Sequence, residues 1–144
     1  MKVYDFPFLR GEKIGPLWLR MLRDNVGIKG IKNLNRLMPV DVHIARATFM
    51  TGVLRCEYSG SLDSIRYKIK DAWIESVKEL EIDGKRIIAL DLDEPLWHLS
   101  KYGCSKKRGN YCPRKYECPV SEFCVSGFVR ITQKGGVYYI KVKT

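Results

Sequence analysis

Four of the chain's five cysteines lie close together in the segment "CSKKRGNYCPRKYECPVSEFC", which runs from Cys104 to Cys124. Their spacing is C-x7-C-x5-C-x5-C, and five lysines or arginines stand between them. The fifth cysteine, Cys56, stands alone. Thiols at this density can form disulfides, bind a metal ion or hold an iron–sulfur cluster, and each alternative implies a different chemistry.

The cysteine count and the N-terminus argue against disulfides. An odd number of cysteines does not make a complete disulfide framework. The opening "MKVYDFPFLRGEK" lacks the apolar core and cleavage site of a secretory signal peptide. We therefore expect a cytoplasmic protein, in which thiols are kept reduced. Structural zinc sites usually contain a C-x2-4-C knuckle, which is missing here, whereas iron–sulfur clusters tolerate wider spacings. The spacing favours a [4Fe–4S] cluster and leaves zinc open as the alternative.

The overall charge indicates an acidic partner. The chain has 144 residues with 26 lysines and arginines against 16 acids, which gives a net charge of +10. A basic balance of this kind is typical of proteins that bind nucleic acid. No run approaches 18 apolar residues, so we expect no membrane partner. The length fits one domain with one core.

The elements ahead of the cysteines have mostly helical patterns. Asp41 and Asp93 are favoured N-cap residues, each directly before a helical run. The segment 62–81 has an apolar face at helical spacing. We expect helices at about 11–25, in a short stretch before Pro39, in the run after Asp41, at 62–81 and at 94–102.

The end of the chain reads as a β-hairpin. Two β-rich runs in "GFVRITQKGGVYYIKVKT" are separated by Lys134, Gly135 and Gly136. We therefore expect a mainly α fold with a cysteine loop and a terminal β-hairpin.

The cysteine segment and the helix before it resemble a known family. "LWHLSKYGC" followed by "CPVSEFC" is similar to the C-terminal iron–sulfur loop of the endonuclease III family of DNA glycosylases. The family spacing is C-x6-C-x2-C-x5-C, so this chain has one extra residue before Cys112 and three after it. The resemblance implies a [4Fe–4S] cluster held by Cys104, Cys112, Cys118 and Cys124, with Cys56 outside it.

Two further segments resemble the same family. "PVDVHIARATFMTGVL" is similar to the helix that carries the family's catalytic aspartate, which falls on Asp41. "FLRGEKIG" resembles the helix–hairpin–helix turn, and Lys13 falls on the lysine that forms a Schiff base in the bifunctional members. Arg10 and Gly11 fall in the part of that turn that contacts DNA phosphates.

The order of these segments implies a fold and a function. It implies a helix–hairpin–helix glycosylase-type helical domain over residues 1–125, including the iron–sulfur loop 104–124, with a β-hairpin extension at 126–144. The implied activity is that of a DNA N-glycosylase, with or without abasic-site lyase activity, acting on double-stranded DNA in the nucleoid during base excision repair. The residues expected to face DNA phosphates are Arg10, Gly11, Lys106, Lys107, Arg108, Arg114 and Lys115.

Other functions remain open from the sequence. Family members carry about half of their helical domain before the hairpin, whereas this chain begins almost at it. An N-terminal half-domain, a partner chain or a second copy is therefore expected to complete the enzyme. The chain could instead be a non-catalytic DNA-binding module with an iron–sulfur cluster or zinc. A third alternative is a zinc-stabilised basic domain that binds RNA.

Overall fold

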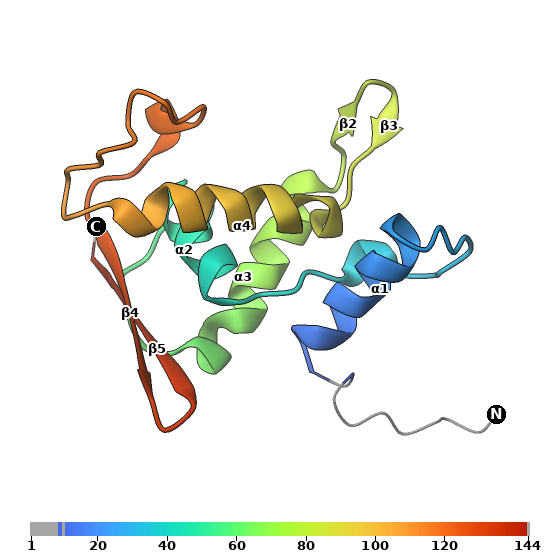
Figure 1. The fold of residues 1–144 in the computed structure, drawn as a ribbon, viewed down its shortest axis with the longest axis horizontal. Helices are drawn as coiled ribbons and strands as arrows, with labels where there is room; N and C mark the ends of the chain where they lie inside the picture. Colours follow the sequence, from blue (N-terminus) through green and yellow to red (C-terminus); the bar gives the residue numbers. More distant parts are fainter. Residues whose placement is uncertain (1–8, 10, 144) are drawn as a thin grey trace.

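The structure is a computed structural model and describes residue 9 and residues 11–143 (Figure 1). The described residues contain four α-helices: α1 (Ile14–Asp24), α2 (Val42–Met50), α3 (Leu62–Val77) and α4 (Asp93–Tyr102). Short 3-10 helices connect them or lie in the cysteine loop: η2 (Leu34–Arg36), η3 (Ala89–Leu92), η4 (Cys104–Lys106) and η5 (Ser121–Phe123). No helix in the described part of the chain is long and apolar enough to cross a membrane.

Helix α2 lies at the centre of the core. It contacts α3, α4 and strand β4 (Phe128–Lys134), so six of its nine residues are buried. Ile44 and Phe49 are almost fully buried, and Trp73 of α3 donates its indole N–H to the hydroxyl of Thr48 at 2.8 Å. Burial on several sides fixes the position of α2, and with it the position of Asp41 directly before its first residue.

The strands form one three-stranded sheet and one small hairpin. Strands β1 (Tyr58–Ser61), β5 (Val137–Lys143) and β4 pair antiparallel in the order β1-β5-β4. The turn between β4 and β5 uses two glycines with positive φ, at +59° and +76°, as a two-residue hairpin turn requires. Strands β2 (Glu81–Ile82) and β3 (Lys85–Arg86) form the second hairpin. Ile140 and Val142 of β5 belong to the same core as the helices.

The mainly α fold of helix–hairpin–helix glycosylase type expected from the sequence is wrong. Of the described residues, 45% are helical and 18% are in strands, with a three-stranded antiparallel sheet, so the protein is a mixed α and β protein. The terminal hairpin forms as expected, but "YSGS" at 58–61 forms a strand where the sequence indicated only a break. This strand exists because β5 supplies its hydrogen-bond partners from about 80 residues further along the chain, which no local pattern reveals.

Helix boundaries also differ from expectation. Helix α3 ends at Val77 instead of 81, because residues 81–82 pair with 85–86 in the β2–β3 hairpin. The short helix expected before Pro39 is a single 3-10 turn. Asp93 is the first residue of α4 and does not cap it; its carboxylate is engaged elsewhere, as described below.

Candidate functional site

Asp41 is the N-cap of α2, as the sequence predicts. Its Oδ1 accepts hydrogen bonds from the backbone N–H groups of His43 and Ile44, both at 2.9 Å. The residue has an extended backbone, the usual conformation for a cap. These bonds fix the carboxylate in one orientation.

Asp41 and Lys13 line the same cavity. Its volume is about 410 Å³, which lies within the usual range for small-molecule sites. Lys13 is exposed at the start of α1, and Asp41 approaches from the α2 side. The structure therefore brings together two candidate catalytic residues that lie 28 positions apart in the sequence. The first turns of α4 complete the wall with Asp93, Glu94, Trp97 and His98.

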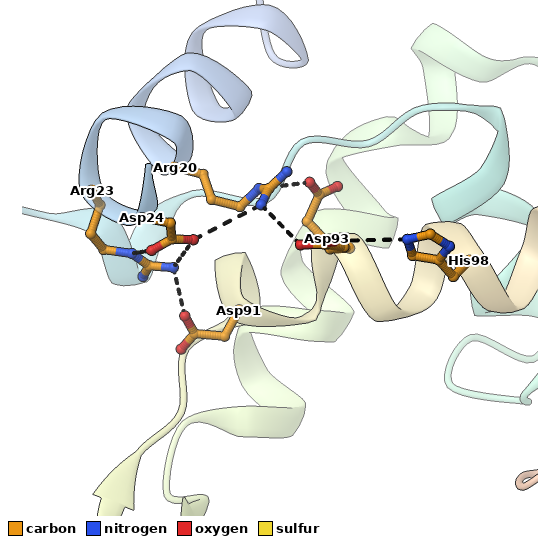
Figure 2. A network of polar contacts seen from close by, with 7 residues as sticks. Arg20, Arg23, Asp24, Asp91, Asp93 and His98 are labelled. Atoms are coloured by element: carbon orange, nitrogen blue, oxygen red, sulfur yellow. Dashed lines mark hydrogen bonds and ion pairs between the residues drawn. The ribbon is translucent and has the colours of Figure 1, made fainter. Parts of the chain in front are cut away.

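An ion-pair network holds α1 against the start of α4 (Figure 2). Arg20 Nε lies 3.0 Å from Asp93 Oδ2, and its Nη1 lies 3.5 Å from a carboxylate oxygen of Glu94. One turn further along α1, Arg23 contacts Asp91 at 2.7 Å. Because α1 carries Lys13 and α4 carries the opposite wall, this network sets the width of the cavity.

Asp93 has an unusual carboxyl group. Burial raises its pKa to about 6, the negative charge of Asp41 pushes the pKa in the same direction, and the ion pair with Arg20 opposes the shift. A carboxyl group with a pKa near neutrality can hold or release a proton under ordinary conditions. From the sequence we expect Asp93 only to cap a helix, since nothing local shows that it would be buried beside a second acid.

The shifted pKa of Asp93 predicts a pH dependence of stability. A carboxyl group whose pKa is higher in the folded than in the unfolded protein stabilises the fold at low pH, and this contribution is lost as the pH rises through about 6. Between pH 4.5 and 7.5 the loss is about 2 kcal/mol in the free energy of unfolding. We expect Asp93→Asn to remove this component, measured by urea unfolding at the two pH values.

The exposed Asp71 of α3 supplies the matched control. Asp71→Asn removes one carboxyl group without touching the cavity. The pH dependence of its free energy of unfolding should therefore follow that of the unmodified protein. If the free energy of unfolding had the same pH dependence in Asp93→Asn as in Asp71→Asn, the pKa of Asp93 would not be raised.

His43 is a packing residue that joins α2 to α4. Its Nδ1 lies 3.3 Å from the hydroxyl of Ser100, and its ring meets Trp97 edge-on with 5.2 Å between centroids. Burial lowers its pKa, so the ring is neutral at physiological pH. Arg46 donates to the same Ser100 hydroxyl at 3.2 Å. These contacts support the cavity wall without entering the cavity.

A second cavity is lined by all four clustered cysteines. Its volume is about 230 Å³, and it lies beside Met50 and Thr51 at the end of α2, with Gly103 at the end of α4. Cys104, Cys112, Cys118 and Cys124, the four predicted ligands, line it together, while Cys56 packs against the core elsewhere. Burial raises the pKa of Cys104 to about 11, and the other three thiols add to the shift. Within residues 9 and 11–143, no three His, Cys, Asp or Glu side chains are close enough together to hold a single metal ion.

The cations of the cysteine loop have different surroundings. Lys107 points inward: its Nζ donates to the carbonyl of Val125 at 2.6 Å and lies 3.6 Å from Cys124 Sγ. Lys106, Arg108, Arg114 and Lys115 are exposed, although Arg114 also pairs with Glu117 at 2.6 Å. Gly11 is exposed beside α1, and Arg10 lies outside the described residues.

Comparisons with models of known protein families, with characterised proteins and with solved structures found no match for this chain. The resemblance to the endonuclease III family therefore rests on the quoted motifs alone.

Proposed function

We propose that the chain acts on DNA as an N-glycosylase with abasic-site lyase activity and carries a [4Fe–4S] cluster in the cysteine cavity. The observation that carries this proposal is the common cavity of Lys13 and Asp41. An amine and a fixed carboxylate facing one space of this size are the groups that Schiff-base chemistry at a sugar carbon requires.

The cavity suggests a division of roles. A damaged nucleotide must leave the duplex stack before its glycosidic bond can be reached. The nitrogen lone pair of the Lys13 amine attacks the anomeric carbon, the bond to the base breaks, and the base leaves with the bonding electrons. The carboxylate of Asp41 takes the proton that the amine loses and stabilises the positive charge that develops on the sugar. Asp93, with its pKa near 6, supplies a proton to the departing base.

The walls of the cavity suit a flipped nucleotide. The indole of Trp97 is an aromatic surface on which a base can stack, and Lys101 Nζ lies 4.4 Å from the ring centroid. The charge of +10 supports binding to a polyanion. The exposed cations Lys106, Arg108, Arg114 and Lys115 of the cysteine loop are the proposed phosphate contacts nearest the cysteine cavity, and Gly11 is the proposed contact nearest Lys13. The proposed contact Arg10 lies outside the described residues.

The cysteine cavity fits a [4Fe–4S] cluster better than a zinc ion. Tetrahedral zinc needs four sulfurs within about 2.3 Å of one point. The four thiols line one cavity of about 230 Å³, but in the described residues no three of them are close enough together to hold a single ion. Cys104, Cys112, Cys118 and Cys124 would hold the cluster, and Lys107 lies within reach of the Cys124 sulfur. When bound, such a cluster supplies a rigid cross-link for the loop and a site for electron transfer.

Borohydride trapping tests the proposed function. The iron-loaded protein is incubated with a duplex that contains one abasic site, and sodium borohydride is added. We expect a covalent protein–DNA adduct, because borohydride reduces the Schiff base between an amine and the opened sugar. Base release without an adduct would restrict the activity to glycosylase. The absence of adduct, base release and strand cleavage would leave a DNA-binding module and refute the enzymatic proposal.

A further inference from the structure

The outer face of the β1-β5-β4 sheet carries a regular pattern of cations. Ile140 and Val142 point into the core, so the alternate residues of β5 point outward. The pairing register places the matching residues of β4 and β1 on the same outer face. These residues are Phe128, Arg130, Thr132, Lys134, Val137, Tyr139, Lys141, Lys143, Ser59 and Ser61. The face therefore has four cations, two aromatic rings and no acid.

Two of these cations are placed where they oppose folding. Arg130 of β4 and Lys141 of β5 are directly opposite each other across the strand pair. Like charges at directly opposed positions destabilise a sheet. None of the four outer-face cations pairs with an acid in the described part of the chain. An anion bound to this face would relieve the repulsion.

Protection of the sheet edge does not explain the pattern. Lysines often occur on edge strands, where they prevent pairing with other molecules. That role suits Lys134 on β4, which is an edge strand. Lys141, however, lies where β5 pairs with β1 on one side and with β4 on the other, so its backbone has no free edge. Its charge needs a different explanation.

The aromatic rings lie among the cations. Tyr139 is 42% exposed on the central strand, two residues from Lys141. Phe128 lies opposite Lys143, with the guanidinium of Arg130 5.6 Å from its ring centroid. Exposed rings among cations are the usual means of binding single-stranded nucleic acid, since bases stack on the rings and phosphates contact the cations.

We propose that this outer sheet face binds single-stranded nucleic acid without sequence preference, with Tyr139 as the stacking platform and Arg130, Lys134, Lys141 and Lys143 as phosphate contacts. The face is separate from the Lys13–Asp41 cavity: the sheet lies at the lower left of Figure 1, while α1 and the start of α4 lie on the right. The inference therefore stands independently of the proposed enzymatic activity.

Fluorescence anisotropy with a labelled 20-nucleotide oligothymidylate tests the surface. The sheet variant Arg130→Gln/Lys141→Gln/Lys143→Gln should bind at least about tenfold more weakly, and its salt dependence should fall by about 2 in log K against log salt. The control variant Lys78→Gln/Lys85→Gln/Arg86→Gln removes the same charge at the opposite end of the molecule, next to the β2–β3 hairpin (Figure 1). We expect it to retain most of the affinity and an unchanged salt slope.

Substitutions at Tyr139 distinguish base stacking from simple charge attraction. Tyr139→Ala should lose about tenfold in affinity, whereas Tyr139→Phe keeps the ring and should bind as the wild type does. Lys141→Thr should raise the melting temperature by about 2 °C while weakening binding, because it removes the opposed charge pair. The melting curves that measure this change also show whether each variant is folded.

Three results would overturn the proposal. The first is unchanged oligothymidylate binding by the sheet variant. The second is an equal loss on a blunt duplex of the same length, which would assign the face to double-stranded DNA. The third is stronger binding of polyglutamate than of oligothymidylate, which would assign it to an acidic protein. None of these measurements uses a damaged base or the trapping reaction, so failure of the enzymatic proposal leaves them interpretable.

Discussion

Replacing Lys13 with glutamine is expected to abolish the borohydride-trapped adduct on abasic-site DNA. The amide cannot form a Schiff base, and Lys13 is the lysine of the cavity that also holds Asp41. Lys13 is exposed, so the substitution should leave the fold intact. Lys29→Gln, at another exposed lysine, is the matched control and should trap as the wild type does. An adduct that survives Lys13→Gln would place the nucleophile elsewhere.

Asp41→Asn separates the catalytic role of the carboxylate from its capping role. Asparagine caps a helix about as well as aspartate, so the two hydrogen bonds to the start of α2 are retained. The negative charge is lost, and base release should slow by about 10²–10⁴-fold. DNA affinity should be unchanged or slightly higher, because the carboxylate repels phosphate. A stopped time course of base release measures the rate, and fluorescence anisotropy on the same duplex measures the DNA affinity.

Asp41→Ala completes the comparison. It removes both the charge and the cap, so it should match Asp41→Asn in rate and also lose about 1 kcal/mol of stability. If Asp41→Asn retained the full rate of base release while Asp41→Ala did not, Asp41 would be only a structural cap.

The parts of this structure that the sequence predicts are those set by neighbouring residues. Asp41 caps α2 because its side chain reaches N–H groups two and three residues away, a pattern visible in any helix start. Gly135 and Gly136 form the turn of the terminal hairpin because both positions have positive φ. The common cavity of the four clustered cysteines also follows from their closeness in the sequence.

The parts that the sequence does not predict depend on distant partners. Strand β1 contains a glycine and two serines, and only pairing with β5 makes it a strand. Arg20 and Asp93 are 73 positions apart, so no periodicity links them, although together they fix one wall of the candidate site. Lys107 belongs to a run of three cations that looks uniformly exposed, but the fold turns it toward Cys124 and Val125.

Changing any one of the four cavity cysteines to serine is expected to remove most of the bound iron. We expect about four irons per wild-type chain and absorption near 400 nm, since a [4Fe–4S] cluster needs four thiolate ligands. Cys112 is the most informative position, because the spacing around it departs most from the family pattern. Cys56→Ser is the control: this half-buried thiol packs against the core away from the cavity and should leave the iron content unchanged.

Loss of the ligand should also loosen the loop. Its aromatic residues are exposed, Tyr116 at 99%, Tyr111 at 70% and Phe123 at 61%, so the loop has little apolar packing of its own. Without a central cross-link, trypsin should cut rapidly after Lys106, Arg108, Arg114 or Lys115, while the core stays resistant. Limited proteolysis of Cys112→Ser and Cys56→Ser, read by mass spectrometry, compares the two cases directly.

The metal content of the purified protein distinguishes an iron–sulfur cluster from a zinc ion in the cysteine cavity. One zinc per chain without absorption near 400 nm would assign the cavity to zinc and refute the cluster. Retention of full iron in Cys112→Ser together with loss in Cys56→Ser would move the fourth ligand to Cys56. That outcome would require the chain around Cys56 to leave the core contacts that it makes in the structure. The melting temperature of Cys56→Ser would then follow its metal content, whereas a simple packing role predicts a change in stability with the iron still bound.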